Sequence, residues 1–436
     1  MDRRAETSKG GARRASFVPG LLALLALPLL FLADTSLAWA RGWRPPSADL
    51  LPGAFVAVFA IALASPLVPL ALALSARFRA FLGARSVQLP LAAFALIGGC
   101  AASEAITRVK LDEWTRLHRR PANLEVMFRP EAQLFPGVFG DSLYRTSSEG
   151  LRGPELPERD QALRILCVGG STTECVYLDD SESWPTLLMG AMNARDGAPP
   201  VWVGGAGISA FSTIEHVPFV ERAAIVDEMD CVVFLVGFND GGRAVVGGME
   251  YGPPPLWRRS SLALLAFELA RWRAERRLLD TLDSFGENIQ LKRDLRAAAQ
   301  HSEAPPELER ALSEYRDRVR RLVEACHEKG VACLFLTQPV LYRRDLPADA
   351  EALLWLGQLE PGVFLGSGPL RDGMDRFNVA LAETCRELDV PCVDLSSMNG
   401  DPSFFFDDCH FNEAGSRRVA ELLLAHLDAE GLPRAF

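Results

Sequence analysis

Five short apolar runs, separated by helical stretches, constrain the fold of this 436-residue chain more than any other feature. They lie at residues 163–168, 200–204, 231–236, 331–336 and 391–395 and are rich in valine, leucine, phenylalanine and cysteine. Runs of this kind that alternate with helices are typical of βαβ units, which build a parallel sheet. We therefore predict an α/β domain with a parallel sheet over residues 161–436.

The stretches between the runs show helical periodicity. Before the fourth run, apolar residues recur at intervals of three and four, and Gly330 follows as a stop signal; they are Leu308, Leu312, Tyr315, Val319, Leu322 and Cys326. Residues 241–305 form an insertion after the third run. It contains an amphipathic helix whose apolar face holds Leu262, Leu265, Leu269, Trp272 and Leu279. This helix either packs on the domain, covers a binding site or touches lipid headgroups.

Three apolar stretches, residues 17–33, 51–75 and 87–102, dominate the N-terminal part of the chain. Each is near the roughly 20 residues that span a bilayer core, so we predict a membrane region of about three helices over residues 1–103. Basic residues before the first stretch and between the second and third place both positions in the cytoplasm. The C-terminal body is then on the extracytoplasmic, or periplasmic, side of the cytoplasmic (inner) membrane.

Two alternatives for this region stay open. The third stretch is short enough to be interfacial or a buried helix instead of a span. The first stretch also resembles a cleaved signal peptide, because residues 38–40 have the small-x-small form that signal peptidase recognises. Cleavage leaves the body on the same side of the membrane. Residues 104–160 then form a connector that ends in the polar sequence PELPERDQ.

Charge and cysteine content exclude several classes of function. The chain has a net charge of −10, although residues 1–103 carry ten Lys/Arg against four Asp/Glu, so the remainder is clearly acidic. An acidic body argues against a nucleic-acid partner. The nine cysteines show no CxxC and no paired metal-ligand spacing, so we predict neither a metal site nor a cofactor. Disulfides are permitted in an oxidising compartment, but the sequence alone does not pair the cysteines.

The first chemical motif, GGSTTE, follows the first apolar run. Gly169 and Gly170 permit a tight turn that presents Ser171 at the start of the next helix. The unpaired N–H groups and positive dipole at a helix N-terminus suit either a phosphate or an oxyanion. Because the loop lacks both GxGxxG and GK[ST], the pattern argues against a nucleotide site.

Three further motifs follow later runs. VGGAGIS leaves the N–H of Gly207 open to a ligand, and VGFND offers the side-chain amide of Asn239 to a developing negative charge. FFDDCHFNEAG places Asp407 three residues before His410, where a carboxylate orients an imidazole. Each motif alone is also found in ordinary turns and caps. The carboxyl ends of parallel strands share one rim, where ligands bind, so we expect the four motifs to form one site.

Together, GGST, Gly207, GFND and DDCHFN resemble the SGNH, or GDSL-like, hydrolase family over about residues 160–430. The resemblance implies a flavodoxin-like, three-layer α/β/α domain. It implies that Ser171 is the nucleophile, His410 the base and Asp407 the residue that orients the base. The implied oxyanion hole consists of the Ser171 N–H, the Gly207 N–H and the Asn239 amide.

The sequence departs from the family pattern at two positions. Gly170 stands where the eponymous motif has aspartate, as in a bacterial branch of envelope proteins, and Gly205 stands where asparagine is frequent. Neither departure removes a proposed triad residue or oxyanion donor. The first weakens any inference about the substrate.

The resemblance implies an enzyme that acts on ester bonds, with three readings of its role. Water as acyl acceptor gives an esterase, most simply a deacetylase of an envelope polysaccharide or lipid. A sugar hydroxyl as acceptor gives an O-acyltransferase of envelope glycans, which needs a partner membrane protein to supply acyl groups. A non-enzymatic envelope scaffold is the third reading. The acceptor depends on how the pocket admits water, which these motifs do not encode.

Overall fold

The computed structural model describes residues 120–432, except residue 198 and residues 246–284. The predicted membrane region (1–103), part of the predicted connector (104–119) and the amphipathic helix predicted within the insertion lie outside the described residues. The chain divides into the units Met1–Gly53 and Ala54–Phe436, and every described residue belongs to the second. Within the described ranges, no helix combines the length and apolar character needed to cross a membrane.

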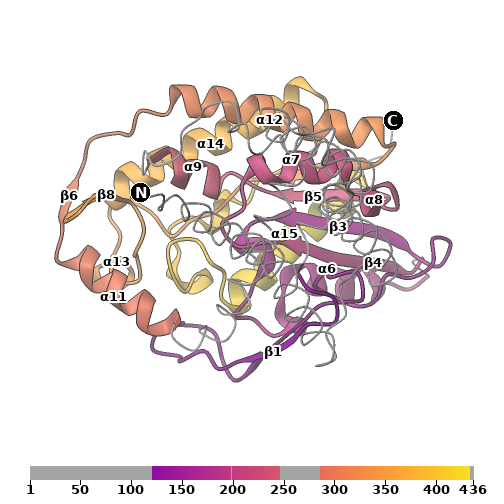
Figure 1. The fold of residues 1–436 in the computed structure, drawn as a ribbon, viewed down its shortest axis with the longest axis horizontal. Coiled ribbons are helices and arrows are strands. Elements are labelled where there is room, and N and C mark those ends of the chain that lie inside the picture. Colours follow the sequence, from indigo (N-terminus) through magenta and orange to yellow (C-terminus); the bar gives the residue numbers. More distant parts are fainter. Residues whose placement is uncertain (1–119, 198, 246–284, 433–436) are drawn as a thin grey trace, which may run out of the picture. The chain divides into compact units, whose positions relative to one another are not determined.

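The five predicted runs form one parallel sheet (Figure 1). Its strands are β3 (Leu163–Gly169), β4 (Val201–Gly207), β5 (Cys231–Leu235), β7 (Ala332–Leu336) and β10 (Cys392–Val393). The spatial order is β10-β7-β5-β3-β4, with every neighbouring pair parallel. Numbered along the chain, this is the order 2-1-3-4-5 of flavodoxin-like folds. The predicted α/β fold with a parallel sheet is confirmed.

Helices cover both faces of the sheet (Figure 1). On one face lie α7 (Thr213–Arg222), α12 (Glu309–Glu328) and α14 (Ser367–Glu387), with α12 packed against both of the others. On the other face α6 (Trp184–Asn193) packs against α15 (Glu413–Glu430). The core between these layers is apolar, and the rings of Phe234 and Phe335 stack at 4.7 Å across β5 and β7.

The remaining described elements are two small sheets and further helices. β1 (Glu125–Phe128) and β2 (Ser142–Arg145) pair antiparallel, and β6 (Gln300–Ser302), β9 (Val363–Leu365) and β8 (Gln358–Glu360) form a second small sheet. The other α-helices are α5 (Ser171–Glu174), α8 (Ala224–Asp227), α9 (Phe238–Val245), α11 (Phe285–Ala297) and α13 (Ala348–Glu351). The 3-10 helices are η2 (Asp180–Glu182), η5 (Ser396–Met398) and η6 (Pro402–Phe404).

The segment before β3 packs on the outer edge of the large sheet. The backbone N–H of Arg152 donates to the Gly205 carbonyl at 2.9 Å, and the Gly205 N–H donates back at 2.8 Å. An uncovered edge strand exposes unpaired backbone groups that invite other chains to pair with it. Residues that the sequence marks only as a connector therefore cover part of β4.

Candidate active site

Ser171 begins a single helical turn, α5, directly after β3. Neighbouring atoms approach the two preceding positions closely. A Cβ on Gly169 would lie 2.5 Å from the Leu235 carbonyl oxygen, and one on Gly170 would lie 2.5 Å from Asn239 Nδ2. The glycines thus let β3 turn into α5 against its neighbours, and the half-buried Ser171 lies at the helix N-terminus.

His410 connects Ser171 to Asp407. Its Nε2 lies 2.7 Å from Ser171 Oγ, and its Nδ1 lies 2.7 Å from Asp407 Oδ2. Asp407 Oδ1 also accepts the backbone N–H of His410 at 2.9 Å, so the short loop fixes the carboxylate relative to the ring. The Phe406 ring stacks on the imidazole with centroids 5.5 Å apart. The structure therefore brings the three predicted triad residues into one hydrogen-bonded chain.

The charges in this hydrogen-bonded triad shift the pKa values of His410 and Asp407. Burial alone would lower the pKa of His410, but the Asp407 charge and its hydrogen bond outweigh burial and raise that pKa. Burial alone would raise the pKa of Asp407, but the His410 charge and several hydrogen bonds lower it. Asp407 is therefore ionised at neutral pH, and the pair favours an imidazole that readily accepts a proton.

A second loop, residues 354–357, holds the two neighbouring aspartates. The indole Nε1–H of Trp355 donates to Asp407 Oδ2 at 3.0 Å. The backbone N–H groups of Trp355 and Leu356 donate to the buried Asp408 carboxylate at 2.9 and 3.2 Å, and the Tyr342 hydroxyl donates to it at 3.0 Å. Burial, followed by the charge of Asp407, raises the pKa of Asp408 to about 6. The Trp355 side chain thus contacts the Asp407 carboxylate from a loop that is distant in the sequence.

The predicted oxyanion donors lie around α5. Asn239, at the start of α9, has its amide beside Gly170, and one N–H of that amide donates to the Phe211 carbonyl at 2.7 Å. The second amide hydrogen can donate to another acceptor. Gly207 ends β4 against α5, where an added Cβ would lie 2.3 Å from Glu174 N. The Ser171 N–H belongs to the first helical turn, whose N–H groups have no acceptor within a helix.

The other end of α5 is held by Arg152, which is buried. Its guanidinium donates to the carbonyls of Glu174 and Cys175 at 2.5 Å and of Leu178 at 2.6 Å, and to Asp180 Oδ1 at 3.2 Å. These carbonyls face the C-terminal end of the helix, where a cation also complements the helix dipole. Arg152 therefore takes the place of a further helical turn after the one that Ser171 begins.

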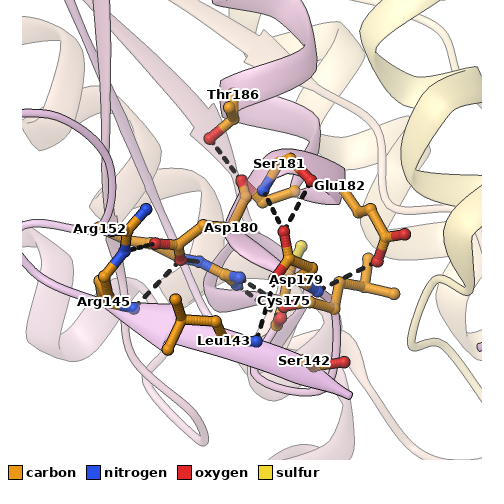
Figure 2. Close-up of polar contacts among 12 residues, drawn as sticks. Ser142, Leu143, Arg145, Arg152, Cys175, Asp179, Asp180, Ser181, Glu182 and Thr186 are labelled. Carbon is orange, nitrogen blue, oxygen red and sulfur yellow. Dashed lines mark hydrogen bonds and ion pairs between the residues drawn. The ribbon is translucent and has the colours of Figure 1, made fainter. Parts of the chain in front are cut away.

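Figure 2 shows the polar network that surrounds Arg152. Asp180 lies between Arg152 and Arg145 and pairs with both, at 3.2 and 3.0 Å. The neighbouring Asp179 caps η2 by accepting the Ser181 N–H at 3.0 Å, and it also accepts the Leu143 N–H of β2. The network joins the segment before β3 to the loop that follows α5.

Glu174 supplies a further tie. Its buried carboxylate accepts from Arg120 Nε at 2.6 Å and from the backbone N–H and hydroxyl of Ser209 at 2.7 and 2.6 Å. Ser209 follows β4, so Glu174 links α5 both to that strand's carboxyl end and to Arg120, in the segment before β1. A buried carboxylate with this set of donors is fully satisfied.

Comparison with known proteins identifies the domain. Residues 167–418, more than half of the chain, match the model of the GDSL-like lipase/acylhydrolase family. The chain belongs to this family. It is accordingly a hydrolase that acts on ester bonds, and the resemblance that the sequence motifs predicted is confirmed. No curated protein matches the chain.

The comparison with solved structures finds several similar chains. An α/β hydrolase from the metagenome of Lake Arreo, Spain, is 13% identical over 62% of this chain and 97% of that chain, with a TM-score of 0.38. The acetylxylan esterase of Geobacillus stearothermophilus is 14% identical over 62% of this chain and 98% of that chain, with a TM-score of 0.37. A further acetyl xylan esterase is 11% identical over 61% and 100%, with a TM-score of 0.38.

An apolar cavity of about 380 Å³ lies beside the site of this GDSL-like domain. It is bounded by α9, α14 and the loop at Leu356, and Asn239 forms part of its wall; other lining residues include Phe238, Leu370, Met374 and Phe377. Ligand pockets in enzymes are commonly apolar with a few placed polar groups. Asn239, the predicted oxyanion donor, is the predicted site residue that also lines the cavity.

A metal ion is a poor match for this centre. In the described part of the chain, Asp407, Cys409 and His410 have ligand atoms near enough to one another to hold a metal. Burial and the two neighbouring carboxylates raise the pKa of the Cys409 thiol well above its usual value, so the thiol stays neutral. A neutral thiol is a weak metal ligand, and His410 Nδ1 is already bonded to Asp407.

Sequence reasoning missed three residues of the site: Trp355, Asp408 and Arg152. Asp408 stands in the DDCH motif, so the adjacent acidic pair was a visible signal. Trp355 and Arg152 carry no local signal, because each lies outside the motifs and its partners are distant in sequence.

Proposed function

We propose that this protein is a membrane-anchored serine esterase that removes acyl groups, acetyl being the simplest, from an envelope polysaccharide or lipid. Ser171 is the nucleophile and His410 is the general base. Asp407 orients the base and stabilises its protonated form. The Ser171 N–H, the Gly207 N–H and the Asn239 amide form the oxyanion hole. No cofactor takes part in this scheme.

One observation carries the proposal: Ser171 Oγ, His410 and Asp407 form a continuous chain with hydrogen bonds of 2.7 Å. As Ser171 Oγ attacks the ester carbonyl carbon, His410 Nε2 takes its proton and then gives it to the departing alcohol. Water next attacks the acyl-serine and loses a proton to His410, which gives it to Ser171 Oγ as the acyl–Oγ bond breaks and the acid leaves. Asp407 stabilises the imidazolium in both steps.

The test uses the full-length chain in detergent and a fluorophosphonate probe, which reacts covalently with activated serines. We expect labelling and hydrolysis of a short-chain aryl ester in the wild type and neither in Ser171→Ala. Ser313→Ala, which changes an exposed serine of α12, is the matched control and keeps both activities. Equal labelling of all three proteins, or of none, would contradict the proposal.

The apolar cavity gives room for acyl groups longer than acetyl as well. A carbonyl oxygen that faces Asn239 lies beside the cavity wall, so a longer chain has an apolar space to enter. Gly373 lines this space, and a Cβ there makes ordinary contacts of 3.6 Å. We expect Gly373→Val to lower kcat/KM for hexanoyl esters more than for acetyl esters. Gly190→Val, at an open helical position on α6, controls for loss of a helical glycine.

Membrane anchoring and the extracytoplasmic location rest on the apolar stretches of residues 1–103 and their flanking basic residues. A periplasmic reporter fused after Phe436 tests the location. We expect activity of a reporter that works only outside the cytoplasm. Activity only of a cytoplasmic reporter would overturn the location and leave the esterase chemistry untouched.

Acyl transfer to a sugar hydroxyl is the second candidate, because the same acyl-serine serves either acceptor. It requires a partner membrane protein that supplies acyl groups. Deleting the gene and measuring acyl groups on purified envelope glycans distinguishes the two: more acylation supports removal, and loss supports transfer. A third candidate, a scaffold without activity, predicts no Ser171-dependent labelling.

A further inference from the structure

Two cysteine pairs with identical spacing lie at the amino end of the sheet, opposite the active site. The sequences CHEKGVAC (326–333) and CRELDVPC (385–392) each run from the end of a long helix into the next strand. The first joins α12 to β7 and the second joins α14 to β10. The described cysteines are all free thiols in the structure.

The backbone makes the same turn in both segments. The Val331 N–H donates to the Cys326 carbonyl at 2.9 Å across Gly330, whose φ is +67°. The Val390 N–H likewise donates to the Cys385 carbonyl at 2.9 Å across Asp389, whose φ is +55°. Both are Schellman motifs, which end a helix with a residue in the left-handed region and fold the following residue back on the last turn.

This turn brings each pair of thiols together. In a Schellman motif the residue after the left-handed position packs against the helix residue that accepts its N–H. Side chains two positions apart along a strand lie on the same face. The Cys333 side chain therefore lies on the same face as Val331, which is the face that packs against Cys326. The Cys326 thiol donates a hydrogen bond to Cys333, which together with burial raises the pKa of Cys326, and the Cys385 thiol similarly donates to Cys392, which raises the pKa of Cys385.

We propose that Cys326 pairs with Cys333, and Cys385 with Cys392, as two disulfides in the exported protein. The inference rests on the proposed extracytoplasmic location, because disulfides persist in oxidising compartments. In each case two thiols give up two protons and two electrons to a disulfide donor. The donor is reduced to two thiols, and the exchange passes through a mixed disulfide.

The burial of these thiols determines at which stage of folding they can be oxidised. Cys326 and Cys385 are fully buried and Cys333 is 4% exposed, while Cys392 is only partly buried. The thiolate is the attacking species, and a raised pKa leaves little of it in the folded protein. The disulfides therefore form while the chain folds. A metal is not the alternative, since among the described residues these four sulfurs do not form a group compact enough to hold one.

Peptide mapping of the exported full-length chain tests the pairing. Trypsin cuts at Lys329 and at Arg386, between the members of each pair. After acid quenching and alkylation without reduction, we expect peptide 322–329 linked to 330–343, and peptide 377–386 linked to 387–417. Fragmentation distinguishes Cys392 from Cys409 in the last peptide. Alkylated cysteines throughout, or links to Cys231, would overturn the inference.

A stability measurement checks the same pairs independently. Dithiothreitol should lower the Tm of the wild type by roughly 5 to 10 °C per pair. In a Cys333→Ala/Cys392→Ala variant the Tm should no longer respond to the reductant, whereas Cys231→Ala, at a buried cysteine of β5, should still respond. A wild-type Tm that ignores the reductant would contradict the disulfides.

Failure of this inference and failure of the proposed function give different results. The cysteines lie at the far end of the strands from Ser171, so ester hydrolysis per folded molecule should be the same in all these variants. If the Phe436 reporter is extracytoplasmic and the thiols are reduced, the pairing is wrong and the esterase stands. If the reporter is cytoplasmic, refolding the full chain in a glutathione redox buffer must give the same two links, or the pairing is wrong.

Discussion

The His410 imidazole is held on three sides, by Asp407, by the Phe406 ring and by Ser171. Such a ring has little freedom to rotate, so its Nε2 stays directed at Ser171 Oγ. The orientation depends on Asp407, which is itself held by backbone N–H groups and by Trp355. The predictions at this scale concern the proton affinity of His410 and the support of Asp407.

The rate of ester hydrolysis should report the raised pKa of His410. The base acts only when neutral, so kcat/KM rises with pH through this pKa, and a raised pKa moves the acid limb to higher pH. We expect a midpoint above 6.5, the ordinary value for histidine. Asp407→Asn should move the limb to lower pH and reduce kcat by about 10⁴-fold. A wild-type midpoint at or below 6.5 in a pH–rate profile would refute this assignment.

Trp355→Phe should slow the reaction without weakening substrate binding. The change removes the indole donor to Asp407 but keeps the backbone N–H that Asp408 accepts. We expect kcat to fall about tenfold, which is less than the loss expected on removing a whole acid–base group, and we expect KM to stay nearly unchanged. Trp202→Phe is the matched control, because it removes an indole hydrogen bond to Pro154 at the sheet edge. Equal kinetics for the two variants would argue against the role of Trp355.

At the scale of elements, α5 is a four-residue helix that cannot be stable by itself. Its geometry depends on side chains from elsewhere. The Arg152 guanidinium donates to the carbonyls at the end of the helix, and the Trp184 indole donates to the Thr172 carbonyl at 3.1 Å. The position of the nucleophile is thus set by residues on both sides of it in the sequence.

Arg152→Met should destabilise the domain strongly. The substitution removes the donor of three buried carbonyl groups. It also removes one of the two arginines that pair with Asp180 and leaves only Arg145. Breaking a buried charged contact of this kind costs about 3 to 5 kcal/mol in the free energy of unfolding. Urea denaturation followed by tryptophan fluorescence measures it. Arg310→Met, which breaks an exposed pair with Glu314, should change little; a similar loss in both would show that burial is irrelevant.

At the scale of the whole molecule, the functional unit extends beyond the residues that match the family. Arg120 and Arg152 precede residue 167, yet they hold Glu174 and the end of α5. The backbone of Arg152 also pairs with β4 at the sheet edge. The segment before β3 is therefore part of the ester hydrolase domain and not merely a connector.

A chain that begins at residue 161 should fail as an enzyme. It lacks Arg120 and Arg152, so the Glu174 carboxylate stays buried without its cation and the edge of β4 is exposed. We expect most of it to be insoluble and the soluble part to react poorly with the fluorophosphonate, whereas a chain that begins at residue 104 labels normally. Equal labelling per soluble molecule would show that the segment is dispensable.

The strands and the motif residues could be predicted because their signals are local. Each strand is a short apolar run, and Asp407 lies only three residues before His410. Parallel topology then carries Ser171, Asn239 and His410 to one rim. Trp355 could not be predicted, because its partner lies 52 residues away in another loop. Arg152 resembled any charged residue of a connector, since its burial arises only when the sheet edge forms.

The close approach of Asn239 to Gly170 has a consequence for protein engineering. Restoring the aspartate of the eponymous motif would look like a harmless return to consensus. Its Cβ, however, would lie 2.5 Å from Asn239 Nδ2 and displace that amide from its bond to Phe211. In this chain the second glycine and the asparagine form a matched pair, so a designer who alters one must redesign the other.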